Sequence, residues 1–359
     1  MSRAALAATV AAIVWLGGLA AASGRDTGLL DPHLDSSVLR RGCTACHEGH
    51  GASRSPMLPG PQRDLCLTCH GFSVDLERLI AAGEVSANVN PALLGSLLQA
   101  PYVHPVSRDA FEAESPGAVT CTSCHSPHRG LRDSRGSGDP PGRRLRSTKN
   151  PNRFEYQLCE SCHGNRGATT QSVVDISRLF NPSNRSYHPV EAPARESSPS
   201  VLPALTGGEI NCTDCHGNAD PTGPSGPHGS TEPYLLRARY TTVDGASESA
   251  EAYALCYTCH ARSDALAAAA FPEHEQHIVD LRASCATCHN AHGSVINRAL
   301  IRFGEETIIA GVGPSALTGR LAFVSSGPGS GACYLTCHGR DHAPEGYGLG
   351  TLPPAPGRP

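Results

Sequence analysis

Hydrophobic residues are sparse along this chain and seldom recur with the period of a long helix or strand. We predict short helices at residues 73–80, after a capping Ser73, and at residues 251–270, which enclose a cysteine motif. Strand patterns are few and lie near Thr241, Thr307 and Leu321, the last two as a hairpin. The pattern therefore predicts a mostly irregular fold with short α-helices and few β-strands.

The longest uncharged apolar stretch lies at the amino terminus. Arg3 precedes the run from Ala4 to Leu19, and Ala20 to Ala22 provide small residues for cleavage, so residues 1–22 are predicted to be a signal peptide. The alternative is a retained membrane anchor, because a run of about 18 residues is long enough to span a bilayer. We favour cleavage and expect an exported protein.

Composition limits how the interior can be built. The chain has 359 residues, of which 39% are hydrophobic and 5% aromatic, and it contains 38 Gly and 29 Pro. So few large apolar side chains give a poor protein core, which means that another group must supply much of the apolar interior. The net charge of −4 excludes a nucleic-acid partner that depends on a strong basic field.

All 16 cysteines belong to one recurring motif, C-x-x-C-H. The cysteine pairs are Cys43 and Cys46, Cys66 and Cys69, Cys121 and Cys124, Cys159 and Cys162, Cys212 and Cys215, Cys256 and Cys259, Cys285 and Cys288, and Cys333 and Cys337. The histidines that follow them are His47, His70, His125, His163, His216, His260, His289 and His338. Two thiols one helical turn apart can form thioethers to one haem, and the next histidine can ligate its iron. The motifs thus predict eight covalent haem c groups, including one at the longer C-x-x-x-C-H motif of Cys333.

Disulfide formation and zinc binding are two other uses of paired cysteines in an exported protein. A secreted cysteine-rich chain can form a disulfide framework, and C-x-x-C pairs can bind zinc. Neither use requires a histidine after the second cysteine, which all eight motifs have. Haem attachment accounts for this histidine, so we favour it.

The motifs alternate between two kinds and form an internal repeat. Motifs of the first kind follow a small or polar residue, and three of the four motifs of the second kind follow a leucine; these preceding residues are Gly42, Thr120, Asn211 and Ser284 for the first kind, and Leu65, Leu158 and Leu255 for the second. The first cysteines at Cys43, Cys121, Cys212 and Cys285 are separated by 78, 91 and 73 residues, and each repeat holds two motifs. We predict four tandem di-haem repeats around a haem-rich core. The predicted boundaries are 1–22 for the signal peptide, 23–95, 96–180, 181–272 and 273–345 for the repeats, and 346–359 for a disordered tail.

Ten further histidines can serve as second axial ligands. One class follows a motif, as in C-H-x-x-H, and another class precedes each pair of motifs. The predicted distal ligands are His33, His50, His104, His128, His188, His228, His277 and His292, which leaves His274 and His342 without a role. The alternative is that such histidines only donate hydrogen bonds to haem propionates or carbonyls, but their recurring number favours ligation.

A histidine three residues after a proximal ligand lies on the same side of that haem and cannot reach its other face. We therefore expect His128 to ligate a neighbouring iron, most simply that of His163, and His104 to ligate that of His125. Met57 is the only methionine after the signal peptide, which excludes a series of His/Met haems and indicates low reduction potentials.

The motifs CTACHEGHG…LCLTCHG, CTSCHSPHRG…LCESCHG and CATCHNAHG resemble those of multihaem cytochromes with a doubled CxxCH motif. The resemblance covers residues 30–342 and implies a chain of bis-His haems with little regular structure, used in respiratory or extracellular electron transfer. The sequence departs from the pattern at His228, at Ala332, where leucine is expected, and at Cys333 to His338.

We predict an electron-transfer protein rather than an enzyme, located in the periplasm or at the cell surface, with unidentified redox proteins as donor and acceptor. One alternative is an octahaem reductase of small nitrogen or sulfur oxyanions, which needs one open iron. Another is a structural subunit of a cytochrome filament or of a conduit through an outer-membrane porin. The arginine-rich span 129–153 is interpreted as a solvated loop that pairs with haem propionates, with a docking patch as the alternative.

Overall fold

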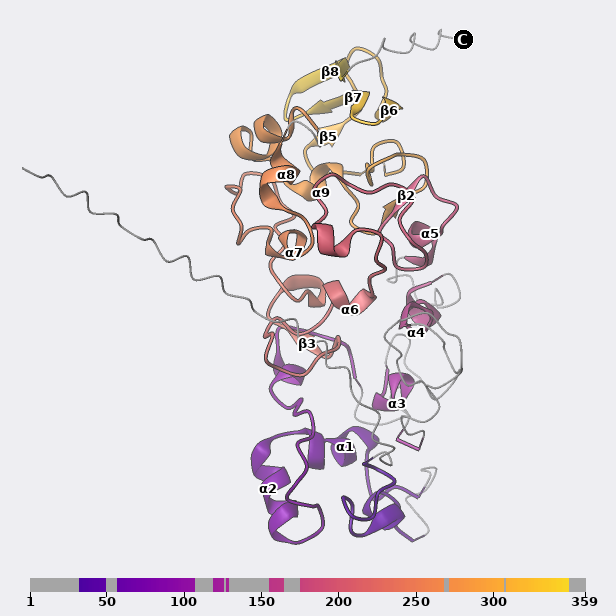
Figure 1. Ribbon diagram of the computed structural model, residues 1–359, viewed down its shortest axis with the longest axis vertical. Helices are drawn as coiled ribbons and strands as arrows, with labels where there is room; N and C mark the ends of the chain where they lie inside the picture. Colours follow the sequence, from indigo (N-terminus) through magenta and orange to yellow (C-terminus); the bar gives the residue numbers. More distant parts are fainter. Residues whose placement is uncertain are drawn as a thin grey trace, which may run out of the picture.

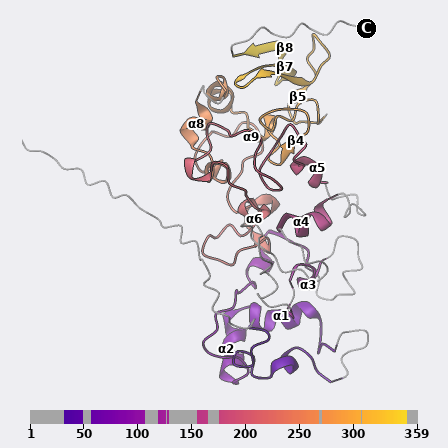
Figure 2. The ribbon, with the colours of Figure 1, turned by 45° about the vertical axis from the view of Figure 1, so that its right-hand side comes forward.

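The structure is a computed structural model that describes residues 32–49, 57–106, 119–125, 127–128, 155–164, 175–267, 271–306 and 308–348. It is elongated, and successive segments follow one another along the long axis from α1 and α2 at one end to the C-terminal strands at the other (Figures 1 and 2). The predicted signal peptide, His50, Thr307 and the span 129–153 lie outside the described residues.

Regular structure is short and scattered, as the hydrophobic pattern predicts. The α-helices are α1 (Gln62–His70), α2 (Ser73–Ala81), α3 (Cys121–Cys124), α4 (Glu155–His163), α5 (Ser177–Phe180), α6 (Cys212–Cys215), α7 (Ala254–Tyr257), α8 (Arg262–Leu266) and α9 (Cys285–Cys288). The other helical turns are η1 (Gly42–Ala45), η2 (Leu97–Gln99), η5 (Pro203–Leu205), η6 (Pro233–Leu235) and the π-helix η7 (Glu275–Asp280). The strands are β1 (Tyr102–Val103), β2 (Ser186–Tyr187), β3 (Gly229–Ser230), β4 (Gly293–Ser294), β5 (Val312–Gly313), β6 (Ala322–Gly327), β7 (Ser330–Cys337) and β8 (Arg340–Tyr347).

Two predicted helices have different outcomes. The helix at 73–80 is confirmed as α2, although Ser73 is its first residue rather than its cap. The single helix predicted at 251–270 is wrong, because α7 and α8 are separate. The chain leaves the helix where His260 forms a β-bridge with Val201 and the Ala261 amide donates to the Ser200 carbonyl.

The strand predictions are confirmed only in part. The segment after Leu321 forms β6, but β6 pairs with β7 and not with the residues near Thr307. Thr241 lies outside the strands, and its amide donates to the Ala252 carbonyl. Residues 346 and 347 belong to β8 and not to the predicted disordered tail.

Helical turns at the cysteine motifs begin at polar capping residues. Thr120 and Asn211 form capping boxes with Ser123 and Asp214, which satisfy the free amides at the start of α3 and α6. Ser284 occupies the N-cap position of α9 without a capping box, and its hydroxyl oxygen lies 3.0 Å from that of Thr287. The small or polar residue before each first-kind motif is thus a helix cap in these three cases, and the cap positions the two thiols on one turn.

Two short antiparallel ribbons connect segments that are far apart in sequence. Strand β1 pairs with β3, and β2 pairs with β4. A Cβ atom on Gly229 would lie 1.9 Å from the Leu97 carbonyl oxygen, and one on Gly293 would lie 2.0 Å from that of Leu179. Glycine is therefore required directly after His228 and His292, because any side chain would collide with the backbone.

The C-terminal sheet is the largest regular unit of the described chain. Strand β7 is central and pairs antiparallel with β5, β6 and β8. Phe303, Ile309 and Leu335 form a small hydrophobic cluster at this end, with Cys333 and Cys337 packed against it. No helix of the described residues is long and apolar enough to cross a membrane.

Candidate haem sites

The cysteines of seven motifs are associated with helical turns, while the eighth pair lies in a strand. Cys121 and Cys124, for example, are the first and last residues of α3. Cys333 and Cys337 instead lie in β7. None of the sixteen cysteines forms a disulfide, so the structure contains no disulfide framework.

Histidine rings from distant parts of the chain face one another in pairs. Seven of these pairs join the histidine of a motif to a histidine outside the motifs. The pairs and their ring-centre separations are His47–His128 (5.8 Å), His70–His33 (5.9 Å), His125–His228 (5.8 Å), His163–His104 (6.2 Å), His216–His292 (6.4 Å), His260–His188 (6.4 Å) and His289–His274 (6.2 Å).

The spacing of the rings fits one metal ion between each pair. Two metal–imidazole bonds of about 2.0–2.1 Å, plus roughly 1 Å from each nitrogen to its ring centre, give a separation of about 6 Å. The observed range of 5.8 to 6.4 Å matches this value. The separation of the paired rings is therefore that expected for two imidazoles bound to opposite sides of one metal ion.

Hydrogen bonds orient several of these rings for ligation. Nδ1 of His70 is 3.0 Å from the Ala92 carbonyl oxygen, and Nδ1 of His289 is 2.7 Å from that of Ala299. A ring that donates from Nδ1 keeps the Nε2 lone pair for a metal. The same contact to a backbone carbonyl is made by His104, His188, His216 and His277.

Burial keeps four of the paired histidines neutral. Removal from water lowers the pKa of His228, His260, His289 and His292 to about 4. An imidazole must be neutral to bind a metal, so these side chains are in the ligating form at neutral pH.

The pairs follow a regular rule in which adjacent predicted repeats interlock. The histidine after a first-kind motif faces the first-kind motif of the preceding repeat, as His228 faces His125. The histidine upstream of a repeat faces the second motif of its own repeat, as His104 faces His163. The short ribbons bring the two classes together, and Nδ1 of His104 is 2.7 Å from the Pro227 carbonyl oxygen.

The simplest pairing expected from the sequence is wrong in two places. His128 lies opposite His47 rather than His163, and His104 lies opposite His163 rather than His125. His128, His228 and His292 each face a motif of the preceding repeat, because successive repeats stack along the long axis. The expectation that His128 faces a motif other than its own agrees with this geometry.

The last repeat departs from the rule. His289 faces His274, a histidine that lies upstream of the motifs of its own repeat. His277 faces His342, with ring centres 6.4 Å apart, and His338 contacts Asp244. The sequence interpretation assigned no role to His274 or His342, although His342 lies only four residues after His338.

Consecutive cysteine motifs are neighbours in space. The Cys66 thiol lies against that of Cys121 and the Cys159 thiol against that of Cys212, and each neighbour raises the pKa of the earlier cysteine. Burial, and then a thiol of the adjacent motif, raise the pKa of five further cysteines: Cys46 beside Cys69, Cys124 beside Cys162, Cys215 beside Cys259, Cys285 beside Cys256, and Cys288 beside Cys333 and Cys337. The order of the motifs in space is therefore their order in sequence.

Polar side chains reinforce the contacts between successive motifs. Glu155 is buried at the start of α4, and its carboxylate accepts hydrogen bonds from the amide and hydroxyl of Thr213 at 2.7 and 3.0 Å. Gln62 occupies the matching place in α1, where its side-chain oxygen accepts from the Thr122 amide at 3.3 Å. Each side chain lies four residues before a second-kind motif and caps the helix of the next first-kind motif.

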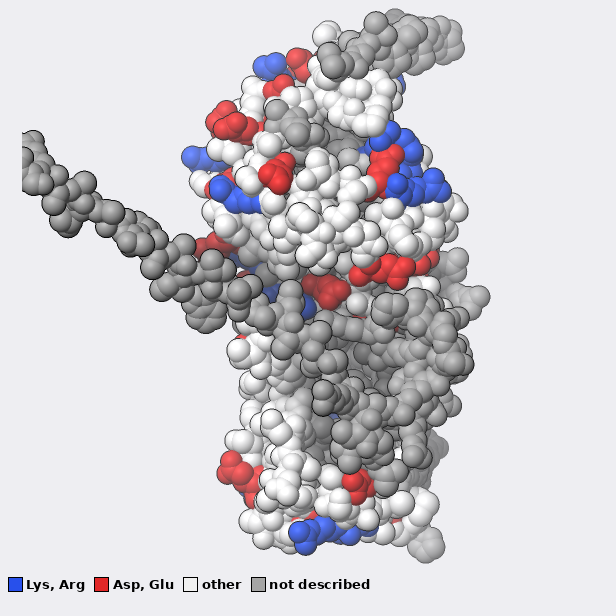
Figure 3. Space-filling model, viewed as in Figure 1, with Lys and Arg blue, Asp and Glu red and all other residues white. Residues whose placement is uncertain are grey.

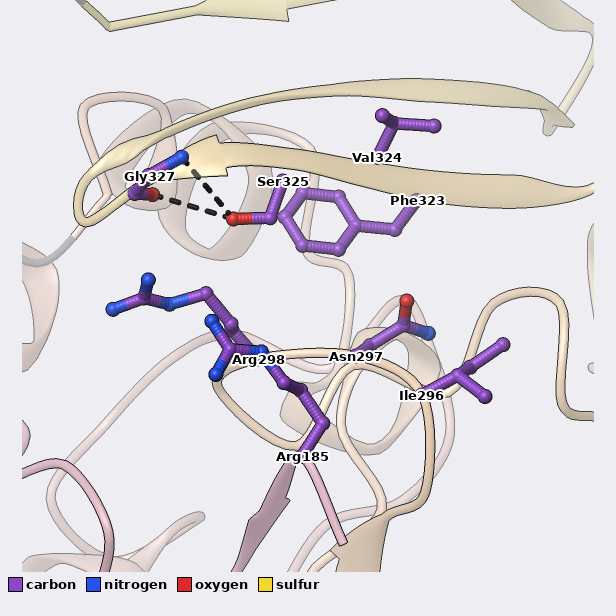
Figure 4. Close-up of a pocket in the computed structure, with 8 residues that line it drawn as sticks. All are labelled: Arg185, Ile296, Asn297, Arg298, Phe323, Val324, Ser325 and Gly327. Carbon is purple, nitrogen blue, oxygen red and sulfur yellow. Dashed lines mark hydrogen bonds between the residues drawn. The ribbon is translucent and has the colours of Figure 1, made fainter.

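A cavity of about 420 Å³ lies between β6 and the loop that follows β4 (Figure 4). Arg185 and Arg298 line it, and both pair with Glu196, at 3.8 and 2.7 Å. Their charges are thus partly balanced within the protein. Acidic and basic side chains are also interspersed over the visible face in Figure 3.

C-x-x-C-H motifs whose histidines face a second ring define a multihaem c-type cytochrome, which carries covalent haem c and transfers electrons. A family model for the doubled CXXCH motif matches residues 37–73. The model described as "Outer membrane cytochrome MtrC/MtrF-like, domains II/IV" matches residues 118–299, half of the chain, and the protein belongs to this family. Comparisons with the curated proteins and with solved structures found no match.

Proposed function

We propose that this protein is an octahaem conductor that passes electrons along eight bis-His haems arranged in sequence order. The observation that supports this most strongly is the set of eight facing histidine pairs among the described residues. Their number equals the number of cysteine motifs, so every haem has two histidines available to it. The four tandem di-haem repeats predicted from the sequence belong to the same proposal.

When bound, each haem supplies an iron that accepts and donates one electron. The protein holds each group through two thioethers and fixes the orientation of its axial imidazoles through backbone carbonyls, as Ala92 does for His70. Two imidazoles at each iron leave no position for a substrate. The pairing therefore favours conduction over reduction of a nitrogen or sulfur oxyanion.

The interlocked repeats also fix the spacing of the haem sites. A ligand such as His228 comes from the repeat after the one whose haem it serves, so two neighbouring repeats share each such site. Glu155 and Gln62 add capping contacts across the same boundaries. A rigid separation between cofactors is what a conductor requires, since loose spacing would interrupt the path.

We further propose that the mature protein is exported and acts at the outer face of the cell with redox proteins as donor and acceptor. The predicted signal peptide and the outer-membrane family support this location. Treatment of intact cells with an added protease tests the location, because a surface protein is digested and a periplasmic one is protected.

An anaerobic coulometric titration of the purified protein tests the conductor proposal. We expect eight haems by intact mass, eight electrons taken up per chain, and no turnover of nitrite, hydroxylamine or sulfite with reduced methyl viologen. The double variant Cys333→Ser/Cys337→Ser is the matched control and should have seven haems and take up seven electrons per chain. Steady turnover of any of these substrates would contradict the proposal and favour the reductase.

A further inference from the structure

The histidine of the eighth motif is not placed like those of the other motifs. Strands β7 and β8 form a hairpin in which Cys337 pairs with Arg340, so His338 and Gly339 form its tight turn. Both turn residues have positive φ, 46° for His338 and 85° for Gly339, as hairpin turns of type I′ require. His338 is thus at the exposed tip of a hairpin, whereas His125 and His289 directly follow a helical turn.

The contacts of His338 occupy the nitrogen that would ligate an iron. Its Nε2 is 2.8 Å from the Asp244 carboxylate, and its side chain is 60% exposed. Asp244 is held in place because it also accepts hydrogen bonds from the Ser284 amide at 2.7 Å and the Thr287 hydroxyl at 2.5 Å. His338 therefore ties the hairpin to the start of α9, and among the described histidines no second ring faces it.

His342 lies on the side of the hairpin that faces the interior. It is directly opposite Leu335 in the β7–β8 ladder, so the two side chains share one face of the sheet. Cys333 and Cys337 are on that face as well, because they alternate with Tyr334 and Thr336 and pack against the same cluster as Leu335. The two thiols and the His342 ring thus point to one side.

The opposing ring comes from η7. His277 faces His342 with ring centres 6.4 Å apart, the same separation as in the His216–His292 and His260–His188 pairs. Nδ1 of His277 is 2.8 Å from the Glu273 carbonyl oxygen, which leaves its Nε2 for a metal. The geometry of this pair is therefore that of the seven pairs that contain a motif histidine.

We propose that the haem attached to Cys333 and Cys337 takes His277 and His342 as its axial ligands, and that His338 has no bond to the iron and anchors the hairpin through Asp244. This inference rests on the proposed function, since it assumes that the eighth motif binds haem. Of the 18 histidines in the sequence, sixteen then fill eight irons, and His338 and His50 are left over.

His342→Ala tests the assignment without altering the motif that attaches the haem. We expect the purified variant to retain eight haems by intact mass and to bind one carbon monoxide per chain in the reduced state. It should also show one high-spin iron per chain in the ferric electron paramagnetic resonance (EPR) spectrum. His33→Ala is the matched positive control, because the assignment of His33 opposite His70 does not depend on the eighth motif.

Two further variants sharpen the result. His277→Ala should open one iron, and His338→Gln should open none while it retains eight haems. The assignment is overturned if His342→Ala stays fully low-spin, or if His338→Gln opens an iron with all haems attached. If His338→Gln loses a haem, His342→Met decides, because replacing a histidine ligand by methionine raises the potential of one haem in eight.

The failures of the two proposals are distinguishable. A wild-type protein with seven haems and free thiols at Cys333 and Cys337 would contradict the octahaem proposal itself. Eight haems together with an unaffected His342→Ala variant would overturn only the ligand assignment.

Discussion

Replacement of His228 by alanine tests the pairing of histidines between adjacent repeats. His228 is half-buried, faces His125 at 5.8 Å, and comes from the repeat after the one that holds α3. The substitution removes one axial imidazole and leaves a cavity of the size of a ring beside one iron. The thioethers of Cys121 and Cys124 do not depend on His228, so all eight haems should remain attached.

The expected loss in the free energy of unfolding follows from the length of chain that the bond between the iron and His228 closes into a loop. A link between the haem held at Cys124 and His228 closes a loop of about 100 residues, which is worth about 4.7 kcal/mol in the chain-entropy treatment of cross-links. This is an upper limit, because the β1–β3 ribbon still joins the same segments. A loss of even half this value is a large share of the roughly 5–15 kcal/mol by which domains are stable.

The assay combines carbon monoxide binding, the ferric EPR spectrum and urea unfolding. We expect one carbon monoxide per chain, one high-spin iron and a lower unfolding midpoint for His228→Ala, against none of these in the wild type. Added imidazole should enter the cavity and restore the low-spin spectrum without repairing the cross-link. A variant that stays low-spin and binds no carbon monoxide would show that His228 is not a ligand.

Three further predictions concern stability. Glu155→Ala should lower the free energy of unfolding by about 1–3 kcal/mol, because it leaves a buried amide unsatisfied. Urea unfolding measures this loss against the control Glu251→Ala, which changes an exposed side chain, and equal losses in the two variants would contradict the capping role. Hydrogen bonds from Arg262 and Tyr257 lower the pKa of Glu248, so its contribution to stability is full at neutral pH and is lost as pH falls through that lowered pKa. Glu248→Gln should therefore be less stable than wild type at pH 7, and a difference in stability that does not shrink between pH 7 and about pH 3 would refute this account. Expression without haem attachment should give an unfolded chain under limited proteolysis, since the haems supply most of the core, and a cooperatively folded apo-protein would disprove it.

The local chemistry of the sites could be predicted from the sequence, because it is encoded within five or six consecutive residues. The C-x-x-C spacing predicted the helical turns of α3, α6 and α9, and the polar residue before each, such as Thr120, proved to be its cap. The short spacing within the motif also predicts that His128 cannot reach the iron of its own motif, and in the structure His128 faces His47 instead.

The partner of each distal histidine could not be predicted in the same way. His228 and His125 are separated by about a hundred residues, and only the stacking of successive repeats determines that they meet. The strand at the eighth motif could have been predicted from the sequence, because Cys333, Leu335 and Cys337 alternate with Tyr334 and Thr336 at the period of a strand. The sequence interpretation treated these residues only as a longer haem motif and did not use the alternation.

The central claim is that eight irons each carry two histidines and none is open. A quantitative ferric EPR spectrum of the purified wild-type protein, with the haem count from intact mass, tests it most directly. The account predicts eight low-spin irons per chain and no high-spin signal. A high-spin signal of one iron per chain in fully loaded protein would contradict it.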